Sequence, residues 1–216
     1  MRTGMTKICT VLFILFITLG SAYAIPLVVG YNTLPGTSVA ADPSLAGPII
    51  VDQMQPFSFS ANGGTVSGEV EVQIIQAVDG GLDFYWRLFN DASSADAITA
   101  LRLASFISPE YDANYRTDSL GDIGPDTALL FASPPGYINF IFSSGLAPGE
   151  SSLFFFMDTT ATSYAETAFY DLTTLNNGYS GTLYDTYAPA VPEPATMLLL
   201  GLGLIGVAGI RRKFKN

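Results

Sequence analysis

Between residues 25 and 191 the chain consists of short runs rich in Val, Ile, Phe, Tyr and Thr, separated by clusters of Gly, Pro, Asn, Asp and Ser. Runs and clusters of this kind are typical of β-strands and turns. No helical pattern lies between them, which disfavours a parallel α/β fold. The sequence therefore predicts an all-β protein with a single β-sandwich, Ig-like or jelly-roll-like. The expected strands are 48–52, 56–61, 65–77, 82–90, 97–107, 128–132, 137–143, 152–158, 165–173 and 180–187.

One hairpin can be predicted in detail from alternation. The apolar residues of 70–74 and of 82–88 each fall on every second position, so each strand has one apolar face. A three-residue loop at 79–81 keeps both apolar faces on the same side, whereas a two-residue turn does not. This loop predicts that Ile74 pairs with Trp86 and Val72 with Leu88, with Arg87 opposite Gln73.

A Pro-Gly turn is predicted at Pro148-Gly149, because proline fixes φ and glycine tolerates positive φ. It leads into the run LFFFMD, residues 153–158, which is too apolar to alternate. We expect this run to be a central strand that is buried on both faces.

The N-terminal 24 residues have the order of a secretory signal peptide. Arg2 and Lys7 precede the apolar run 8–20, and Ala22-Tyr23-Ala24 fits the small-x-small cleavage rule of signal peptidase. An N-terminal membrane anchor is the alternative, although the run is short for a bilayer span. Residues 1–24 are therefore predicted to be a signal peptide, and Cys9, the only cysteine, is predicted to leave with it.

A second apolar segment lies near the C-terminus, at 195–210, and basic residues follow it directly. It is slightly short for a straight transmembrane helix, but bilayer thinning and snorkelling can cover the difference. Basic residues are costly to move across a bilayer, so they are expected to stay in the cytoplasm. The residues that would stop transfer are Arg211, Arg212, Lys213 and Lys215.

Residues 192–216 resemble the PEP-CTERM sorting signal. Pro192-Glu193-Pro194 supplies the motif, 195–210 the transmembrane helix, and 211–216 the basic tip. The resemblance implies export in a Gram-negative bacterium that makes extracellular polysaccharide, transient anchoring in the inner membrane, and processing by an exosortase-type membrane protease near the motif. The destination would be the cell surface or the extracellular matrix. A plain single-pass anchor is the alternative.

The predicted body, 25–191, is strongly acidic and lacks the usual catalytic side chains. It holds eighteen acidic residues against three arginines, and the chain has no histidine. Such a charge repels phosphate backbones and excludes nucleic-acid binding. Without histidine or a mature cysteine, catalytic triads, thiol catalysis and the usual zinc sites are excluded. We predict that the protein is not an enzyme; a glycoside hydrolase using Glu69 and Glu71 is the remote alternative.

An oxygen-rich segment, YDANYRTDSLGDIGPD, is the candidate for a calcium site. Its carboxylates are Asp112, Asp118, Asp122 and Asp126, and their spacing is not that of an EF-hand. An ordinary polar loop is the alternative. Beyond this ion, no cofactor is expected.

The expected role is structural or interactive, among extracellular polysaccharides. A calcium-assisted carbohydrate-binding adhesin is the alternative. Tyr85 and Phe89 fall on the outward face of their predicted strand, where aromatic rings could stack on sugars. The favoured alternative is that these outward rings pack under a loop or against a neighbouring strand.

Overall fold

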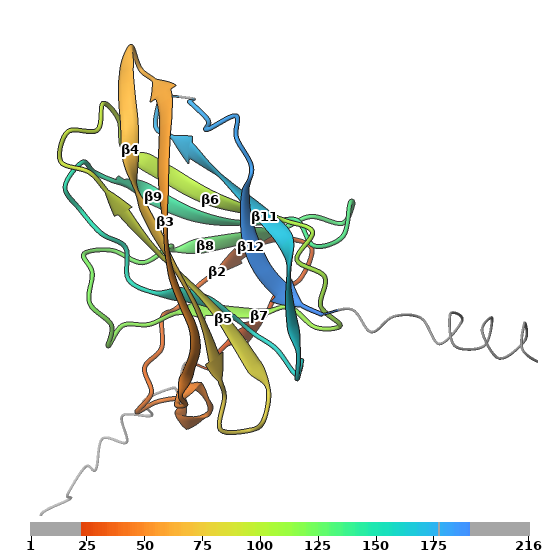
Figure 1. The fold of residues 1–216 in the computed structure, drawn as a ribbon. Helices are drawn as coiled ribbons and strands as arrows, with labels where there is room; N and C mark the ends of the chain where they lie inside the picture. The colour runs from red at the N-terminus through yellow and green to blue at the C-terminus, as the bar shows by residue number, and fades with distance from the viewer. Residues whose placement is uncertain (1–22, 177, 191–216) are drawn as a thin grey trace, which may run out of the picture.

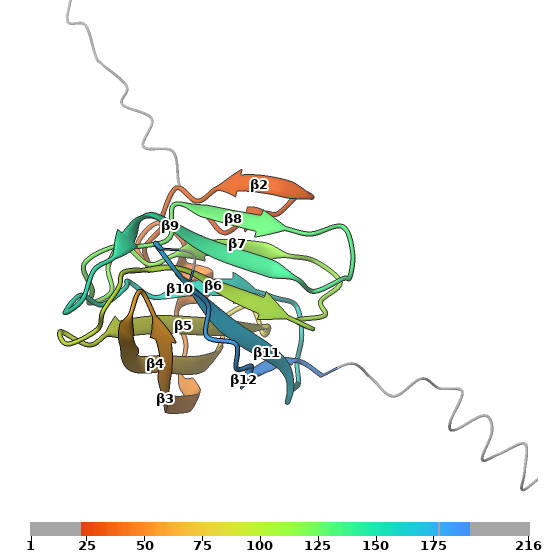
Figure 2. The same cartoon turned by 90° about the horizontal axis from the view of Figure 1, so that it is seen from above.

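The computed structural model describes residues 23–176 and 178–190, which form two antiparallel six-stranded sheets packed face to face (Figures 1 and 2). The predicted all-β sandwich is thus confirmed. Sheet A runs in the order β1 (Ile25–Pro26), β7 (Asp112–Tyr115), β10 (Phe155–Asp158), β5 (Leu82–Asn90), β4 (Gly64–Gln76) and β3 (Ile49–Ala61). Sheet B runs in the order β12 (Tyr184–Pro189), β11 (Tyr164–Thr174), β6 (Ile98–Ala104), β9 (Ile138–Leu146), β8 (Thr127–Leu130) and β2 (Gly30–Thr33). One short 3₁₀ helix, Pro43–Leu45, precedes β3.

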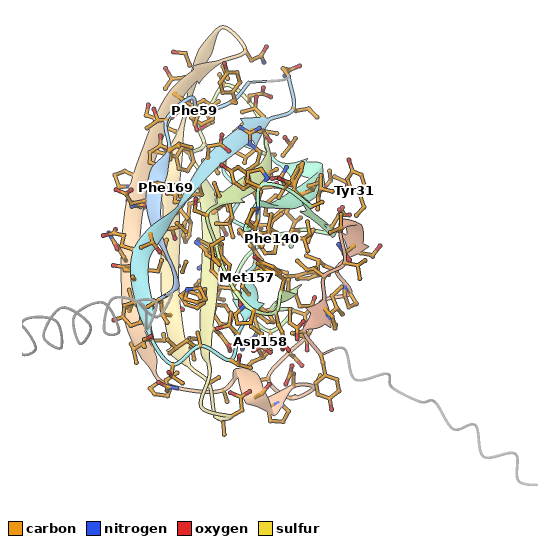
Figure 3. All side chains as sticks on the ribbon, turned by 90° about the vertical axis from the view of Figure 1, so that its right-hand side faces the viewer. Tyr31, Phe59, Phe140, Met157, Asp158 and Phe169 are labelled. Carbon is orange, nitrogen blue, oxygen red and sulfur yellow. The ribbon has the colours of Figure 1, made fainter. Side chains whose placement is uncertain are left out.

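Aromatic side chains from both sheets fill the interior. Trp86 of β5 is fully buried, and its ring centroid lies 6.2 Å from that of Phe155 on β10 and 6.2 Å from that of Phe140 on β9. Figure 3 shows Phe140 and Met157 inside the sandwich and Tyr31 at its periphery. Burying each large apolar side chain contributes about 1.5–3 kcal/mol, so this cluster is a major source of the sandwich's stability.

The indole N–H of Trp86 donates a hydrogen bond across the sandwich to the Thr186 hydroxyl of β12, at 3.0 Å. Both residues are buried. A buried indole N–H needs a partner, so this bond fixes the position of β12 over β5. The same strand therefore holds the C-terminal end of the described body against the core.

The β4–β5 hairpin has the predicted faces but not the predicted register. Val70, Val72 and Ile74 are buried in the core. However, Ile74 pairs with Phe84 and Val72 with Trp86, and the connection between the strands spans 77–81. The predicted pairing of Ile74 with Trp86 is therefore wrong by two residues. Both registers keep the apolar faces on the same side, so alternation alone could not separate them.

A longer connection replaces the predicted three-residue loop because its own hydrogen bonds close it. The Ala77 N–H donates to the Gly81 carbonyl, and the Gly80 N–H to the Ala77 carbonyl. In the resulting register Arg87 lies directly opposite Glu71, not opposite Gln73 as predicted.

The two strands expected at 48–52 and 56–61 are one continuous strand, β3. Pro56 sits inside it, paired with Glu69 of β4. Proline cannot donate to a strand ladder, but β3 is the edge strand of sheet A, where one side of the backbone has no neighbouring strand among the described residues. The edge position therefore explains why proline does not end this strand.

The predicted turn is confirmed, and the predicted central strand is confirmed over Phe155–Asp158, whereas Leu153 and Phe154 precede that strand and are half-buried. Gly149 has φ +89°, and the Glu150 N–H donates to the Ala147 carbonyl across the Pro148-Gly149 corner. Farther along, β10 lies between β5 and β7 with Phe155, Phe156 and Met157 fully buried. Phe155 and Met157 face the core, whereas Phe156 belongs to a smaller apolar cluster on the outer side of sheet A.

Candidate functional site

The sorting tail and most of the signal peptide lie outside the described residues. This holds for Ala22 and for the predicted motif, helix and basic tip at 192–216. Ala24, the last residue of the predicted signal peptide, is described and packs against the outer apolar cluster of sheet A. Within 23–176 and 178–190, no helix is long and apolar enough to cross a membrane.

The four aspartates predicted to bind calcium have separate surroundings. Asp112 begins β7, and Asp118 accepts two hydrogen bonds from the Arg116 guanidinium. Asp122 accepts from the Ser151 N–H, and Asp126 from the Ser143 N–H and hydroxyl.

The structure therefore does not bring Asp112, Asp118, Asp122 and Asp126 together around one position. Part of the expected loop is strand β7, and the rest is tied to neighbouring segments by these separate bonds. In the described part of the chain, no group of three or more acidic side chains is placed to hold a metal ion. The four residues are thus not a single calcium site in this geometry.

A different set of acids shares one row of sheet A. Asp158 of β10 pairs with Asp112 of β7 on one side, and on the other side it neighbours Asp83 of β5, next to the Met157–Phe84 pair. We call Asp83, Asp158 and Asp112 the aspartate row. Asp83 is fully buried, and neither of its carboxyl oxygens has a hydrogen-bond donor in the described structure.

Burial raises the pKa of Asp83, and the neighbouring Asp158 carboxylate raises it further. Burial also raises the pKa of Asp158. Two adjacent carboxylates in a low-dielectric site cannot both ionise cheaply, so the protonated form of Asp83 is favoured.

A small cleft lies on the outer face of sheet B. It has a volume of about 270 Å³, and we call it the sheet B cleft. Three neighbouring strands supply its polar floor, because Asp171 of β11 pairs with Arg102 of β6, which pairs in turn with Asn139 of β9. The defining residues are Arg102, Phe131, Tyr137, Asn139, Asp171 and Leu183.

The charged pair in the cleft is rigidly oriented. The Arg102 guanidinium donates to both carboxylate oxygens of Asp171, with Nε 2.6 Å from Oδ1. This hydrogen bonding raises the pKa of Arg102. A guanidinium has five N–H donors and the fork uses two, so donors remain for a ligand.

Two aromatic rings stand beside this pair. Phe131 and Tyr137 flank the β8–β9 connection, and the Phe131 N–H donates to the Tyr137 carbonyl at 3.0 Å. Their side chains are 39% and 38% exposed, and Leu183 adds an apolar wall. The cleft thus combines open rings with fixed hydrogen-bonding groups, the combination that orients small polar ligands.

The outward aromatic residues Tyr85 and Phe89 do not form an open surface for stacking on sugars. Tyr85 and Phe89 do face outward from β5, but Tyr85 is only 1% exposed and its ring stacks on Phe156. The Arg87 guanidinium covers Phe89, 4.5 Å from the ring centroid. Tyr85 lines a larger groove with Arg116 and Asp118, yet its ring is not open to a ligand there. The structure thus agrees with the favoured alternative, in which these outward rings pack against neighbouring residues.

Residues 190–213 match the family model of the PEP-CTERM protein-sorting motif. The match covers the predicted Pro192-Glu193-Pro194 motif, the apolar segment 195–210 and the first three bases. Neither a curated protein nor a solved structure gives a significant match to this chain. The match begins at the last described residue of the sandwich, Ala190.

Proposed function

We propose, on the premise that this chain carries a PEP-CTERM sorting motif, that it is an extracellular matrix or cell-surface protein of a Gram-negative bacterium whose β-sandwich binds polysaccharide. The motif implies export, a membrane-anchored sorting signal and processing by exosortase, a membrane protease. The role of the sandwich is binding and not catalysis. Its lack of histidine and of cysteine after residue 24 supports this part of the proposal.

The observation that carries the proposal is the pairing of open rings with a fixed ion pair in the sheet B cleft. A sugar ring presents apolar C–H groups on its faces and hydroxyls around its edge. Phe131 and Tyr137 offer surfaces for the faces, and Arg102 and Asp171 offer donors and acceptors for the hydroxyls.

The acidic charge of the body decides the class of polysaccharide. Eighteen acidic residues against three arginines repel a polyanion. One of those arginines, Arg102, is already paired with Asp171. We therefore infer that the ligand is a neutral polysaccharide, recognised through hydroxyls and ring faces.

Retention on insoluble neutral polysaccharide tests the binding part of the proposal. Tyr137→Ala and Phe131→Ala should each weaken retention, because each removes a stacking surface. Tyr179→Ala is the matched control, since Tyr179 is 63% exposed but is not among the residues that define the cleft. Equal retention of all three variants and the unaltered protein would contradict the proposal.

The C-terminal peptide of the exported protein tests the sorting part. Mass spectrometry should find a new C-terminus near Pro192–Pro194 in cells that contain the exosortase, and a chain ending at Asn216 in cells that lack it. An intact C-terminus in both strains would identify an ordinary membrane-anchored protein.

A calcium-assisted adhesin remains the alternative proposal, but the separate surroundings of the four predicted aspartates give it less support. Its test is thermal unfolding with calcium and with a chelator. A rise in the melting temperature with calcium would favour it.

A further inference from the structure

The sandwich is tightly held up to the residue at which the sorting motif begins. Pro189 pairs with Tyr164 of β11, and Ala188 is 1% exposed. The Ala190 N–H donates to the Ser163 carbonyl at 3.0 Å. Because the family match starts at Ala190, the chain has no spacer between the folded body and the motif.

This lack of a spacer limits how far the processing site can be from the body. A fully extended chain gains at most about 3.6 Å per residue, so Pro194 can be no more than about 14 Å from Ala190. Pro192, two residues along, is within about 7 Å by the same limit. Any enzyme that binds Pro192-Glu193-Pro194 must therefore approach the surface around Ala190.

That surface carries a pocket of about 450 Å³, formed where the 107–109 and 160–163 segments meet the end of β12. We call it the exit rim, and Figure 1 shows β12, in blue, ending at this side of the sandwich. None of its lining residues is charged. Its main members are Ile107, Pro109, Ala161, Thr162, Pro189 and Ala190.

The neutrality of the exit rim is notable on a body with eighteen acidic residues. A neutral patch can be desolvated at low cost, whereas buried unpaired carboxylates are expensive. Ile107, 38% exposed, offers apolar area, and Thr162 and Ser163 offer hydroxyls. The rim therefore suits a contact with a protein surface. Because the motif lies close to Ala190 along the chain, a protease that binds the motif comes close to the rim.

We propose that the exit rim is the surface through which the folded body contacts the sorting protease while the motif is bound. The proposal rests on the sorting function proposed above. The contact is expected to orient the short segment Val191–Pro194 for cleavage, because a body attached this closely cannot rotate freely.

The first test is the rate of processing of the full-length protein in cells, measured by pulse-chase. Thr162→Glu and Ile107→Glu place a charge on the rim at exposed positions. Each should slow processing roughly tenfold, which corresponds to about 1.4 kcal/mol of lost contact energy. Thr182→Glu is the matched control, since Thr182 is also exposed but precedes β12, at the other end of that strand. Unchanged rates for both rim variants would overturn the proposal.

The second test inserts a ten-residue Gly-Ser linker between Ala190 and Val191. If the rim contact positions the motif, the linker alone should slow processing, and Thr162→Glu should have no further effect in the presence of the linker. Faster processing with the linker would mean that the body obstructs the protease, which also overturns the proposal.

A third measurement separates the protease from the membrane as the partner. The purified precursor is mixed with vesicles of phosphatidylethanolamine and phosphatidylglycerol without protease. Equal binding of the unaltered protein and Thr162→Glu is expected, and weaker binding of the variant would identify a lipid contact instead. An intact C-terminus in the unaltered protein in cells would overturn the sorting function itself, whereas normal processing of the rim variants would overturn only the rim contact.

Discussion

Asp83 on β5 and Asp158 on β10 are neighbouring carboxyl groups on one face of sheet A, and Asp83 is fully shielded from solvent. Figure 3 shows Asp158 one residue beyond the core residue Met157. The charged groups around the pair are all acidic: Asp79, Asp42 and Asp112. Both carboxyl groups have raised pKa values, so we expect the stability of the protein to depend on pH.

The first prediction concerns this pH dependence. Burial raises the pKa of Asp83 from 3.8 to about 9. A raised folded-state pKa means that stability is fully present at acid pH and is lost as pH rises toward that value. The free energy of unfolding should therefore fall from pH 5 to pH 8, by at most about 1.4 kcal/mol per pH unit. Asp83→Asn should flatten this slope, because the amide stays neutral at every pH; chemical denaturation at each pH measures the slope. A slope equal to that of the unaltered protein would show that another group controls stability in this range.

The second prediction concerns the geometry of the sheet B cleft. Arg102→Lys keeps the charge but loses the planar fork that holds Asp171. We expect affinity for polysaccharide to fall roughly tenfold, about 1.4 kcal/mol. Stability should change by less than about 1 kcal/mol, because the pair is partly exposed. Arg116→Lys is the matched control, since it breaks the equivalent fork to Asp118 in the segment that follows β7. Affinity losses of the same size in both variants would argue against the cleft.

The third prediction concerns the bond between the sheets. Thr186→Val keeps the shape of the side chain but leaves the Trp86 indole N–H without its acceptor. The expected cost is about 1–3 kcal/mol in the free energy of unfolding. Thr186→Ser retains the hydroxyl and should lose less. If Val and Ser destabilise the protein equally, packing and not the hydrogen bond holds β12 in place.

The fourth prediction concerns a close approach in sheet A. A Cβ atom at Gly68 of β4 would lie 1.9 Å from the carbonyl oxygen of Phe89 on β5. Gly68→Ala must therefore displace the backbone and should cost about 2–3 kcal/mol. Ser58→Ala, at an exposed position of the adjacent β3, should change stability by less than about 0.5 kcal/mol. Similar melting temperatures for both variants would contradict this account.

The class of fold was predictable because it depends on local alternation. The buried faces of β4 and β5 follow from residues two positions apart, as the core residues Val72 and Trp86 show. The register was not predictable, because a shift of two residues preserves those faces. Strand β7 was missed because its sequence, DANY, has no alternation that separates it from the acidic turns after it.

The candidate site was less predictable than the fold. Arg102 lies between Leu101 and Leu103, which both belong to the core, so alternation places its side chain on the outer face. Its partner Asp171, however, comes from β11, a strand 69 residues farther along the chain. Which distant strands become neighbours is decided by sheet order, which local patterns do not contain. No pattern in the sequence indicated that the rings of Phe131 and Tyr137 would lie beside this charged pair.

Pro56 in the middle of β3 has a consequence for association between copies of the protein. Strand β3 is 13 residues long and forms a free edge of sheet A, which is the kind of edge that can template pairing with another copy. A strand added at this edge would face Pro56, which has no N–H group to donate. The ladder of hydrogen bonds would therefore be interrupted at that position. One proline thus interrupts the hydrogen-bonding pattern of a long edge strand and disfavours fibre formation through that edge.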